Sequence, residues 1–217
     1  STLDRSSAAS DVYKRQADGI VVVPPLLRKE VLEMTPTKGD YLHGYLLNSG
    51  FGEEICSWHK VHPSVELHIF WDKKEVLPEV KVDSRLSFHQ LNDTLFVCYM
   101  AGARAYATTA GFESVCEAMY LGKPVLMVPT HIEQACNAFD AVHAGAGVIA
   151  DRFDLDALLQ LSQTHHQPDL AFSHWVKQAD WLILRELRPD LLMEETSASL
   201  WHRLSTRWYR FGKSLSI

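Results

Sequence analysis

The sequence predicts an α/β fold in which about six parallel strands form a Rossmann-like sheet covered by helices on both faces. Two observations lead to this prediction. Short apolar runs alternate along the chain with longer amphipathic stretches, which is typical of strands connected by helices. The apolar runs also lack an alternating polar face, which indicates strands that are buried on both sides.

Six strands are expected in chain order, each an apolar run bounded by a small polar loop, a proline or a glycine. Helices are expected between them wherever the apolar period lengthens, and Asn92 or Asp93 is expected to cap one of them. The expected strands are residues 41–47, 65–70, 85–91, 103–108, 124–129 and 145–150. The expected helices are residues 53–59, the stretch that carries Leu95, Phe96 and Tyr99, residues 112–121, residues 132–143 and the stretch that begins at 155–161.

Four segments are expected along the chain. Residues 1–16 are polar and resemble the read-through of a cloning vector or adaptor, which predicts a non-native or disordered leader. Residues 17–40 carry a β-branched run, two consecutive prolines and a turn cluster, as an interdomain linker does. Residues 41–165 form the ligand-binding domain, and residues 166–217 form a C-terminal helical extension. The chain is therefore expected to be a fragment that lacks an N-terminal domain.

Composition narrows the class of protein. The formal net charge of −6 argues against a general nucleic-acid binder. No run of the chain approaches the roughly 20 apolar residues of a membrane span. The four cysteines form no CxxC pair and sit among apolar neighbours, so they are expected to be reduced core thiols in a cytoplasmic protein.

The C-terminal tail is rich in tryptophan, leucine and basic residues. From Trp201 it carries several basic residues and no acid. One interpretation is that terminal helices pack an aromatic stripe on the domain. The alternative is an interface with a missing domain or peripheral contact with an anionic membrane surface, at the cytoplasmic face.

Ligands of open parallel sheets bind beyond the carboxyl ends of the strands, where four strand-to-helix loops meet here. In the third of these loops, Gly111 introduces a turn that exposes amides at a helix start, and such amides favour a phosphate. The Ser114 hydroxyl adds a hydrogen-bond donor, although residues 109–114 also fit an ordinary helix cap. Glu117 follows on the same helix face and suits a ribose diol, or else is a solvated glutamate.

The fourth loop precedes another helix. At the start of this helix, the Glu133 carboxylate accepts hydrogen bonds and the Gln134 amide both donates and accepts them. Such a pair suits several sugar hydroxyls, although both residues can also be capping groups. Asn137 follows one turn later on the same face. His131 has no metal-ligand partner nearby in the sequence, so a loop role is favoured over zinc binding.

These residues, in this order and spacing, resemble the donor-binding region of GT-B fold glycosyltransferases. The UDP-sugar box of that family has a Gly-aromatic-x-Ser-x-x-Glu segment, then Gly-x-Pro, a strand that ends in Pro, and acid-Gln-x-x-Asn-Ala. The general layout also resembles the sugar transferase of peptidoglycan lipid synthesis. The matching residues are Gly111, Phe112, Ser114, Glu117, Gly122, Pro124, Pro129, Glu133, Gln134, Asn137 and Ala138.

The resemblance implies that the chain is the C-terminal half of a GT-B fold and assigns a donor site to it. Thr109 stands where many relatives have histidine, and Glu113 stands where asparagine is frequent. The implied contacts are Asn48, Ser49 and Gly50 at the diphosphate; His89, Gln90 and Leu91 around the base; Thr109, Gly111, Phe112, Glu113 and Ser114 near phosphate; Glu117 at the ribose; and Glu133, Gln134 and Asn137 at the donor sugar.

The resemblance also implies a reaction. The protein would transfer a sugar from a nucleotide-diphosphate donor, a UDP-sugar by this motif, to a hydroxyl of a lipid, a glycan or a small molecule. It would need no cofactor or metal, because amides and a helix dipole hold the leaving diphosphate. The catalytic base would come from the missing N-terminal domain, so the fragment would bind the donor weakly without turnover. The alternatives are a sugar-nucleotide epimerase of the same fold and a non-catalytic nucleotide- or partner-binding module, in which Thr109 and Glu113 record lost chemistry.

Overall fold

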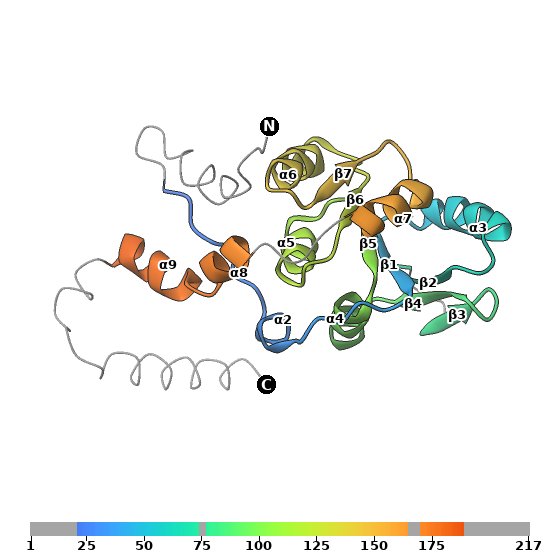
Figure 1. The fold of residues 1–217 in the computed structure, drawn as a ribbon, viewed down its shortest axis with the longest axis horizontal. Coiled ribbons are helices and arrows are strands. Elements are labelled where there is room, and N and C mark those ends of the chain that lie inside the picture. Colours follow the sequence, from blue (N-terminus) through green and yellow to red (C-terminus); the bar gives the residue numbers. More distant parts are fainter. Residues whose placement is uncertain (1–20, 74–76, 165–169, 189–217) are drawn as a thin grey trace.

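A computed structural model of the chain describes residues 21–73, 77–164 and 170–188, and these form one twisted sheet between two layers of helices (Figure 1). The described residues contain a seven-stranded sheet in the order β3-β4-β2-β1-β5-β6-β7. All neighbouring strands are parallel except β3, which is antiparallel to β4. The predicted fold class is confirmed. The strands are β1 (Tyr41–Leu46), β2 (Glu66–Trp71), β3 (Glu79–Lys81), β4 (Leu86–Gln90), β5 (Ala105–Thr108), β6 (Val125–Met127) and β7 (Gly147–Ile149).

The strand order creates a switch point at the centre of the sheet. The chain moves outward from β1 through β2 to β4 and then crosses back to β5, on the other side of β1. The connections after β1 and β5 therefore leave the sheet in opposite directions. In an open α/β sheet, the crevice at such a point is where ligands bind.

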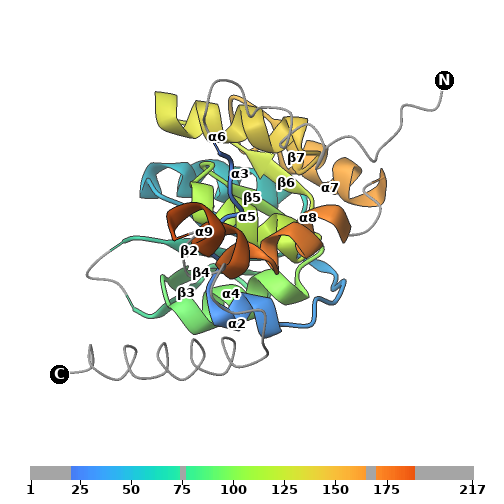
Figure 2. The ribbon, with the colours of Figure 1, turned by 90° about the vertical axis from the view of Figure 1, so that its left-hand side faces the viewer.

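Two apolar cores hold the helices on the sheet. The first, which contains Phe70, Phe96 and Tyr106, lies under α4, α5 and α6, with α2 and α8 packed against its outer side. The second, which contains Ile69 and Leu158, lies under α3 and α7 on the opposite face. Helix α8 packs against α5 on the outside of the first layer, and Figure 1 shows α9 farther out, beyond α8. Figure 2 views the domain from the side of these two helices. The helices are α2 (Lys29–Glu33), α3 (Gly52–Val61), α4 (Asp93–Gly102), α5 (Phe112–Tyr120), α6 (Ile132–His143), α7 (Leu155–Thr164), α8 (Leu170–Val176) and α9 (Ala179–Leu187), and a short 3₁₀ helix, η1 (Ser49–Phe51), precedes α3.

The structure adds a strand and a short helix to the sequence-based expectations and corrects the expectation for the cysteines. Strand β3 was not expected, because its three residues are mostly charged and exposed and give no apolar signal. The segment expected to be a linker contains α2, whose Val31 is fully buried. All four cysteines are free thiols. The expectation that all four lie in the core is wrong for Cys98 and Cys136, which are exposed on their helices. The leader 1–16 and the tail from residue 189 lie outside the described residues.

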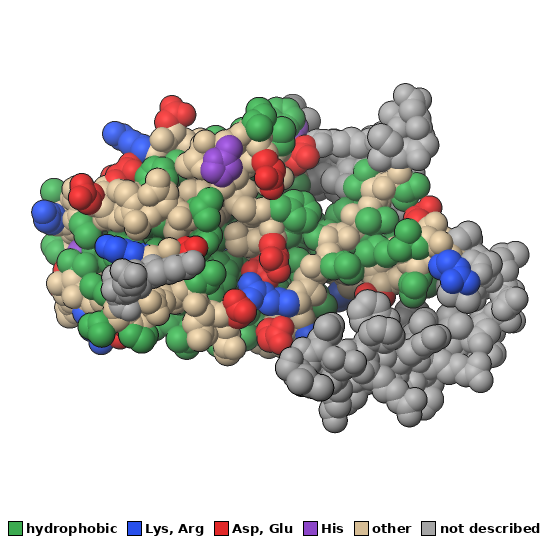
Figure 3. Space-filling model, turned by 180° about the vertical axis from the view of Figure 1, so that it is seen from behind, with side chains coloured by type: hydrophobic (Ala, Val, Ile, Leu, Met, Phe, Trp, Pro, Cys, Tyr) green, Lys and Arg blue, Asp and Glu red, His purple; other side chains and the backbone are tan. Residues whose placement is uncertain are grey.

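The surface of the described part is mixed in character. Seen from behind, acidic, basic and apolar side chains are interspersed over the domain (Figure 3). No helix among residues 21–73, 77–164 and 170–188 has the length and apolar character that a membrane crossing needs.

Helix α4 begins at the expected cap. The Asn92 side chain accepts a hydrogen bond from the Leu95 amide at 2.9 Å. We expect Asn92→Ala to lower the free energy of unfolding by about 1 kcal/mol, because an amide of the first turn loses its partner. Chemical denaturation measures the loss. Asp93→Ala is the control, since the Asp93 side chain is 88% exposed and makes no cap, and it should cost less than half as much. Equal losses in the two variants would contradict the capping role.

Candidate donor site

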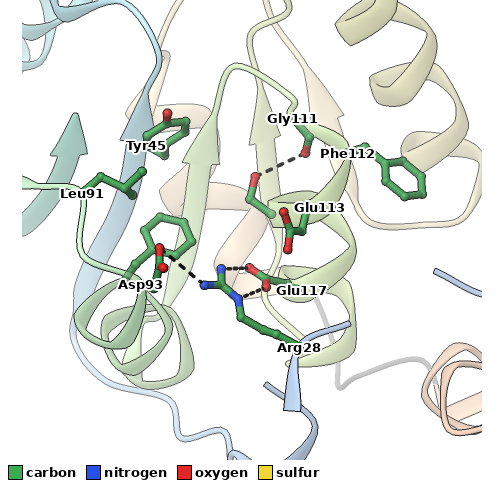
Figure 4. Close-up of a pocket in the computed structure, with 10 residues that line it drawn as sticks. Arg28, Tyr45, Leu91, Asp93, Gly111, Phe112, Glu113 and Glu117 are labelled. Carbon is green, nitrogen blue, oxygen red and sulfur yellow. Dashed lines mark hydrogen bonds and ion pairs between the residues drawn. The ribbon is translucent and has the colours of Figure 1, made fainter. Parts of the chain in front are cut away.

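A pocket of about 540 Å³ opens between the starts of α4 and α5, at the carboxyl ends of β1 and β4 (Figure 4). It lies at the switch point of the sheet, where parallel α/β folds bind their ligands. Four parts of the chain form its wall: the residue before α2, the end of β1, the loop before α4 with the first turn of that helix, and the start of α5. The residues that line it are Arg28, Tyr45, Leu91, Asp93, Phe96, Gly111, Phe112, Glu113, Ser114 and Glu117.

The start of α5 offers unpaired amides to this pocket. Gly111 is the N-cap residue, and no side chain among the described residues caps the helix. The Ser114 hydroxyl donates instead to the Gly111 carbonyl at 3.3 Å, as Figure 4 shows. The amides of the first helical turn have no acceptor within the helix, and the helix dipole adds partial positive charge there. This end of the pocket therefore suits an anion such as a phosphate group.

The loop before α5 has a constrained backbone. Ala110 has a φ of +66°, which is the left-handed region that disfavours a residue with a Cβ atom, and it is fully buried. The Asn137 side chain donates to the Ala110 carbonyl at 3.4 Å. Asn137 thus supports the loop from α6, and it lines a separate apolar pocket of about 180 Å³ rather than the main one.

Glu117 and Arg28 form an ion pair at the opposite end of the pocket from Gly111 (Figure 4). Arg28 Nε donates to one Glu117 oxygen, and Nη2 donates to the other at 2.9 Å. The Glu117 side chain is completely buried, whereas 26% of the Arg28 side chain is exposed. The hydrogen bond to Glu117 raises the pKa of Arg28 above its usual value. Arg28 Nη1 also lies 3.9 Å from Asp93 Oδ1. Arg28 therefore lies between an acidic residue at the start of α4 and one on α5.

Some of the expected donor-binding residues meet in this pocket and others do not. Those that line it are Leu91, Gly111, Phe112, Glu113, Ser114 and Glu117. The exposed loop residues Asn48, Ser49 and Gly50 lie at the same edge of the sheet, where Asn48 caps η1 through the Gly50 amide. The remaining residues, apart from Asn137, are His89, Gln90, Thr109, Glu133 and Gln134, and none of them lines the pocket.

Among these residues, His89 and Gln134 have side-chain partners in the described part of the chain, and Thr109 is buried. His89 is buried in β4, where it stacks on Phe70 and contacts His68 through a ring nitrogen at 3.1 Å. Burial lowers the pKa of His89. Thr109 is 1% exposed in the loop after β5. The buried Gln134 accepts hydrogen bonds from the Thr130 amide and hydroxyl, and this contact ties the start of α6 to the preceding loop.

Four lining residues were missed by sequence reasoning: Arg28, Tyr45, Asp93 and Phe96. Tyr45 and Phe96 fit the pattern of strand and helix core, and Asp93 fits the pattern of a helix start. Arg28 is separated by 89 positions from its carboxylate partner, so no local spacing could have connected them. Among the residues that the structure describes, no group of three or more metal-ligating side chains comes together.

The fold and the site define a Rossmann-like domain of the kind found in GT-B folds, with a pocket at the switch point of its sheet. The chain belongs to glycosyl transferase family 1: residues 8–163 match the model of that family. A search among curated proteins found no match.

Solved structures match the fold. The glycotransferase of kitacinnamycin has 17% sequence identity and a TM-score of 0.54, over 77% of this chain and 49% of that one. CalG4, the calicheamicin glycosyltransferase, has 20% identity and a TM-score of 0.50, over 88% of this chain and 51% of that one. The chain thus spans about half the length of these two structures. The spinosyn rhamnosyltransferase SpnG complexed with thymidine diphosphate matches with 14% identity and a TM-score of 0.45, over 76% of this chain and 46% of that one, a similarity too low to support an argument.

Proposed function

We propose that this glycosyltransferase chain binds a nucleoside-diphosphate sugar, such as a UDP-sugar, in the pocket between α4 and α5, for transfer of the sugar to a hydroxyl acceptor. The observation that supports this proposal most strongly is the uncapped start of α5, which opens into the pocket at the switch point of the sheet. The diphosphate would lie against the amides after Gly111, with its charge stabilised by the helix dipole. A leaving diphosphate held in this way needs no metal ion.

The acceptor and its activating base would come from a domain outside this chain. The chain spans about half of the solved structures that it matches. The isolated 217-residue chain should therefore bind the donor without transferring the sugar. A transfer assay in which this chain alone shows normal turnover would contradict this part of the proposal. A cytoplasmic location, and contact of the basic tail with a membrane face, remain parts of the same proposal.

Nucleoside diphosphates should stabilise the chain against heat. A ligand present at 100 times its Kd adds about 2.7 kcal/mol to the free energy of unfolding, and this gain raises Tm. UDP, GDP and TDP can be compared with the matching nucleosides in a thermal-shift assay. The diphosphates should raise Tm more than the nucleosides, and a flat response to the whole panel would contradict the donor site.

A matched pair of substitutions at Gly111 tests where the diphosphate lies. An added Cβ at Gly111 would meet only the Ser114 hydroxyl among the described residues, at 3.7 Å, so alanine fits. Aspartate is also a good N-cap residue, so the helix should remain intact. Gly111→Asp should weaken UDP binding at least about 10-fold by placing a carboxylate beside the phosphate site, whereas Gly111→Ala should change it little. Equal binding by both variants would place the diphosphate elsewhere.

The product distinguishes a transferase from an epimerase. In the full-length protein, transfer releases a free nucleoside diphosphate, whereas an epimerase leaves the nucleotide attached to the sugar. Ion-exchange chromatography of the nucleotide products measures this directly. We expect free diphosphate.

A further inference from the structure

Two buried hydroxyl groups lie on β5, on the face of the sheet that α5 covers. Tyr106 and Thr108 are two positions apart on the strand, so their side chains leave the sheet on the same side. Both side chains have no exposed surface. Among the residues that the structure describes, neither hydroxyl has a hydrogen-bond partner of normal length and angle. Such groups are rare in a native core, because a buried hydroxyl without a partner costs free energy.

The Tyr106 hydroxyl lies behind the wall of the pocket between α4 and α5. The Tyr106 ring meets the edge of the Phe96 ring, with the ring centroids 6.1 Å apart. Burial raises the pKa of Tyr106, and the nearby Ser114 hydroxyl opposes this effect, whereas the charge of Glu117 adds to it. All three neighbours line the pocket. The phenol therefore faces the pocket from behind without reaching it.

Ser114 connects the Tyr106 hydroxyl with the pocket. The Ser114 hydroxyl donates to the Gly111 carbonyl at 3.3 Å, which is long for a hydrogen bond between two oxygens. A phosphate oxygen is a stronger acceptor than a carbonyl, because it carries charge. A serine hydroxyl has one donor and two acceptor lone pairs, and its hydrogen turns to suit its partners. Ser114 can therefore donate to a phosphate and accept from Tyr106 at the same time.

We propose that Tyr106 is a positioning residue of the donor site and acts through Ser114. When a phosphate group lies at the start of α5, the Ser114 hydroxyl turns from the Gly111 carbonyl and donates to a phosphate oxygen. The Tyr106 hydroxyl then donates to the Ser114 oxygen, so that this bond forms only in the complex. Successive hydrogen bonds of this kind strengthen one another. The inference rests on the proposed function, since it assumes that the diphosphate lies at the start of α5.

Tyr106→Phe removes only this hydroxyl, and calorimetry with UDP measures the effect on binding. The Kd for UDP should rise about 5-fold, as expected for the loss of one neutral hydrogen bond. The Tm of the chain without UDP should not fall, because the hydroxyl has no regular bond to lose in that state. A purely structural role predicts the opposite pair of results, a lower Tm and an unchanged Kd.

Tyr41→Phe is the matched control, because it removes a hydroxyl that has a partner and is remote from the pocket. Tyr41 is the first residue of β1, whereas the pocket lies at the carboxyl ends of the strands. Its hydroxyl donates to the Tyr99 carbonyl at 2.9 Å. This substitution should lower Tm and leave the Kd for UDP unchanged. An equal fall in Tm for Tyr106→Phe would mean that its hydroxyl is already bonded without a ligand, which overturns the inference.

A double-mutant cycle tests whether Tyr106 acts through Ser114. Ser114→Ala should raise the Kd for UDP about 10-fold, because the phosphate loses a hydrogen-bond donor. In the double variant Tyr106→Phe/Ser114→Ala, the loss of the phenol hydroxyl should add less than about 2-fold, since no serine oxygen remains to accept from it. An unchanged Kd in Ser114→Ala, or effects that multiply in the double variant, would contradict the proposed route.

The outcomes separate this inference from the proposed function. If the wild-type chain does not bind UDP, the proposed function fails and the inference fails with it. If the wild type binds UDP and Tyr106→Phe binds it equally tightly, only the role of Tyr106 is wrong.

Discussion

Arg28→Ala should lower the free energy of unfolding by about 3 kcal/mol, because it leaves a buried carboxylate without its partner. Glu117 has no exposed surface, and both of its oxygens are hydrogen-bonded to Arg28. The cost is expected at the lower end of the range for a buried ion pair, since 26% of the Arg28 side chain is exposed. Urea denaturation followed by circular dichroism measures the change.

Substitution of the acidic partner should lower the free energy of unfolding much less. In Glu117→Gln the amide still accepts one hydrogen bond, and the freed guanidinium can turn toward water, so a loss of about 1 kcal/mol is expected. Lys29→Ala, at an exposed neighbour, should stay within about 0.5 kcal/mol of the wild type. A double-mutant cycle over Arg28 and Glu117 should give a coupling free energy above about 1 kcal/mol. Additive losses would mean that the two side chains do not stabilise each other.

Acid should destabilise the protein through His43. This side chain is fully buried in β1 between the rings of Phe70, Phe96 and Tyr106, and neither of its ring nitrogens has a hydrogen-bond partner in the described part of the chain. Burial lowers the pKa of His43 to about 3, and the charge on neighbouring His68 lowers it as well. The unfolded chain binds this proton near pH 6.5. The contribution of His43 to stability is therefore complete above pH 6.5 and is lost progressively between pH 6.5 and about 3.

The expected slope is about 1.4 kcal/mol for each pH unit in that window. His43→Leu has a similar volume and no titrating group, so it should reduce the pH dependence by this amount while it leaves stability near pH 8 little changed. His131→Ala is the control, because His131 is exposed and its removal should keep the wild-type slope. Denaturation curves at several pH values measure the slopes. Equal slopes for the wild type and His43→Leu would contradict the role of His43.

The sheet could be predicted from the sequence because its strands are continuous apolar runs. All six expected strands are present near their expected positions, and Asn92 caps α4 as expected. Strand β3 was missed because its pairing with β4 depends on backbone hydrogen bonds and not on apolar side chains. In such a strand, neither composition nor periodicity differs from that of a loop.

The part of the site on α5 could also be predicted, because the residues of the expected box follow one another on one helix. Gly111, Ser114 and Glu117 all line the pocket. The partner of Glu117 could not be predicted. Arg28 stands in a segment whose prolines indicated a linker. The burial of Val31 in the core and the hydrogen bond from the Tyr120 hydroxyl to the Leu32 carbonyl bring this segment to α5. Contacts between distant segments depend on tertiary packing, which a single sequence does not reveal.

The margins of the sheet bear on how the protein avoids intermolecular association. At one margin the short β3 runs antiparallel to its neighbour and presents Glu79 and Lys81 to solvent, and charged side chains on a short strand oppose the addition of a strand from another molecule. At the other margin β7 has three residues, and an added Cβ at Gly147 would overlap the Val125 carbonyl of β6. Neither margin offers a long, apolar template, so the parallel sheet is protected from edge-to-edge aggregation in spite of its strongly apolar strands.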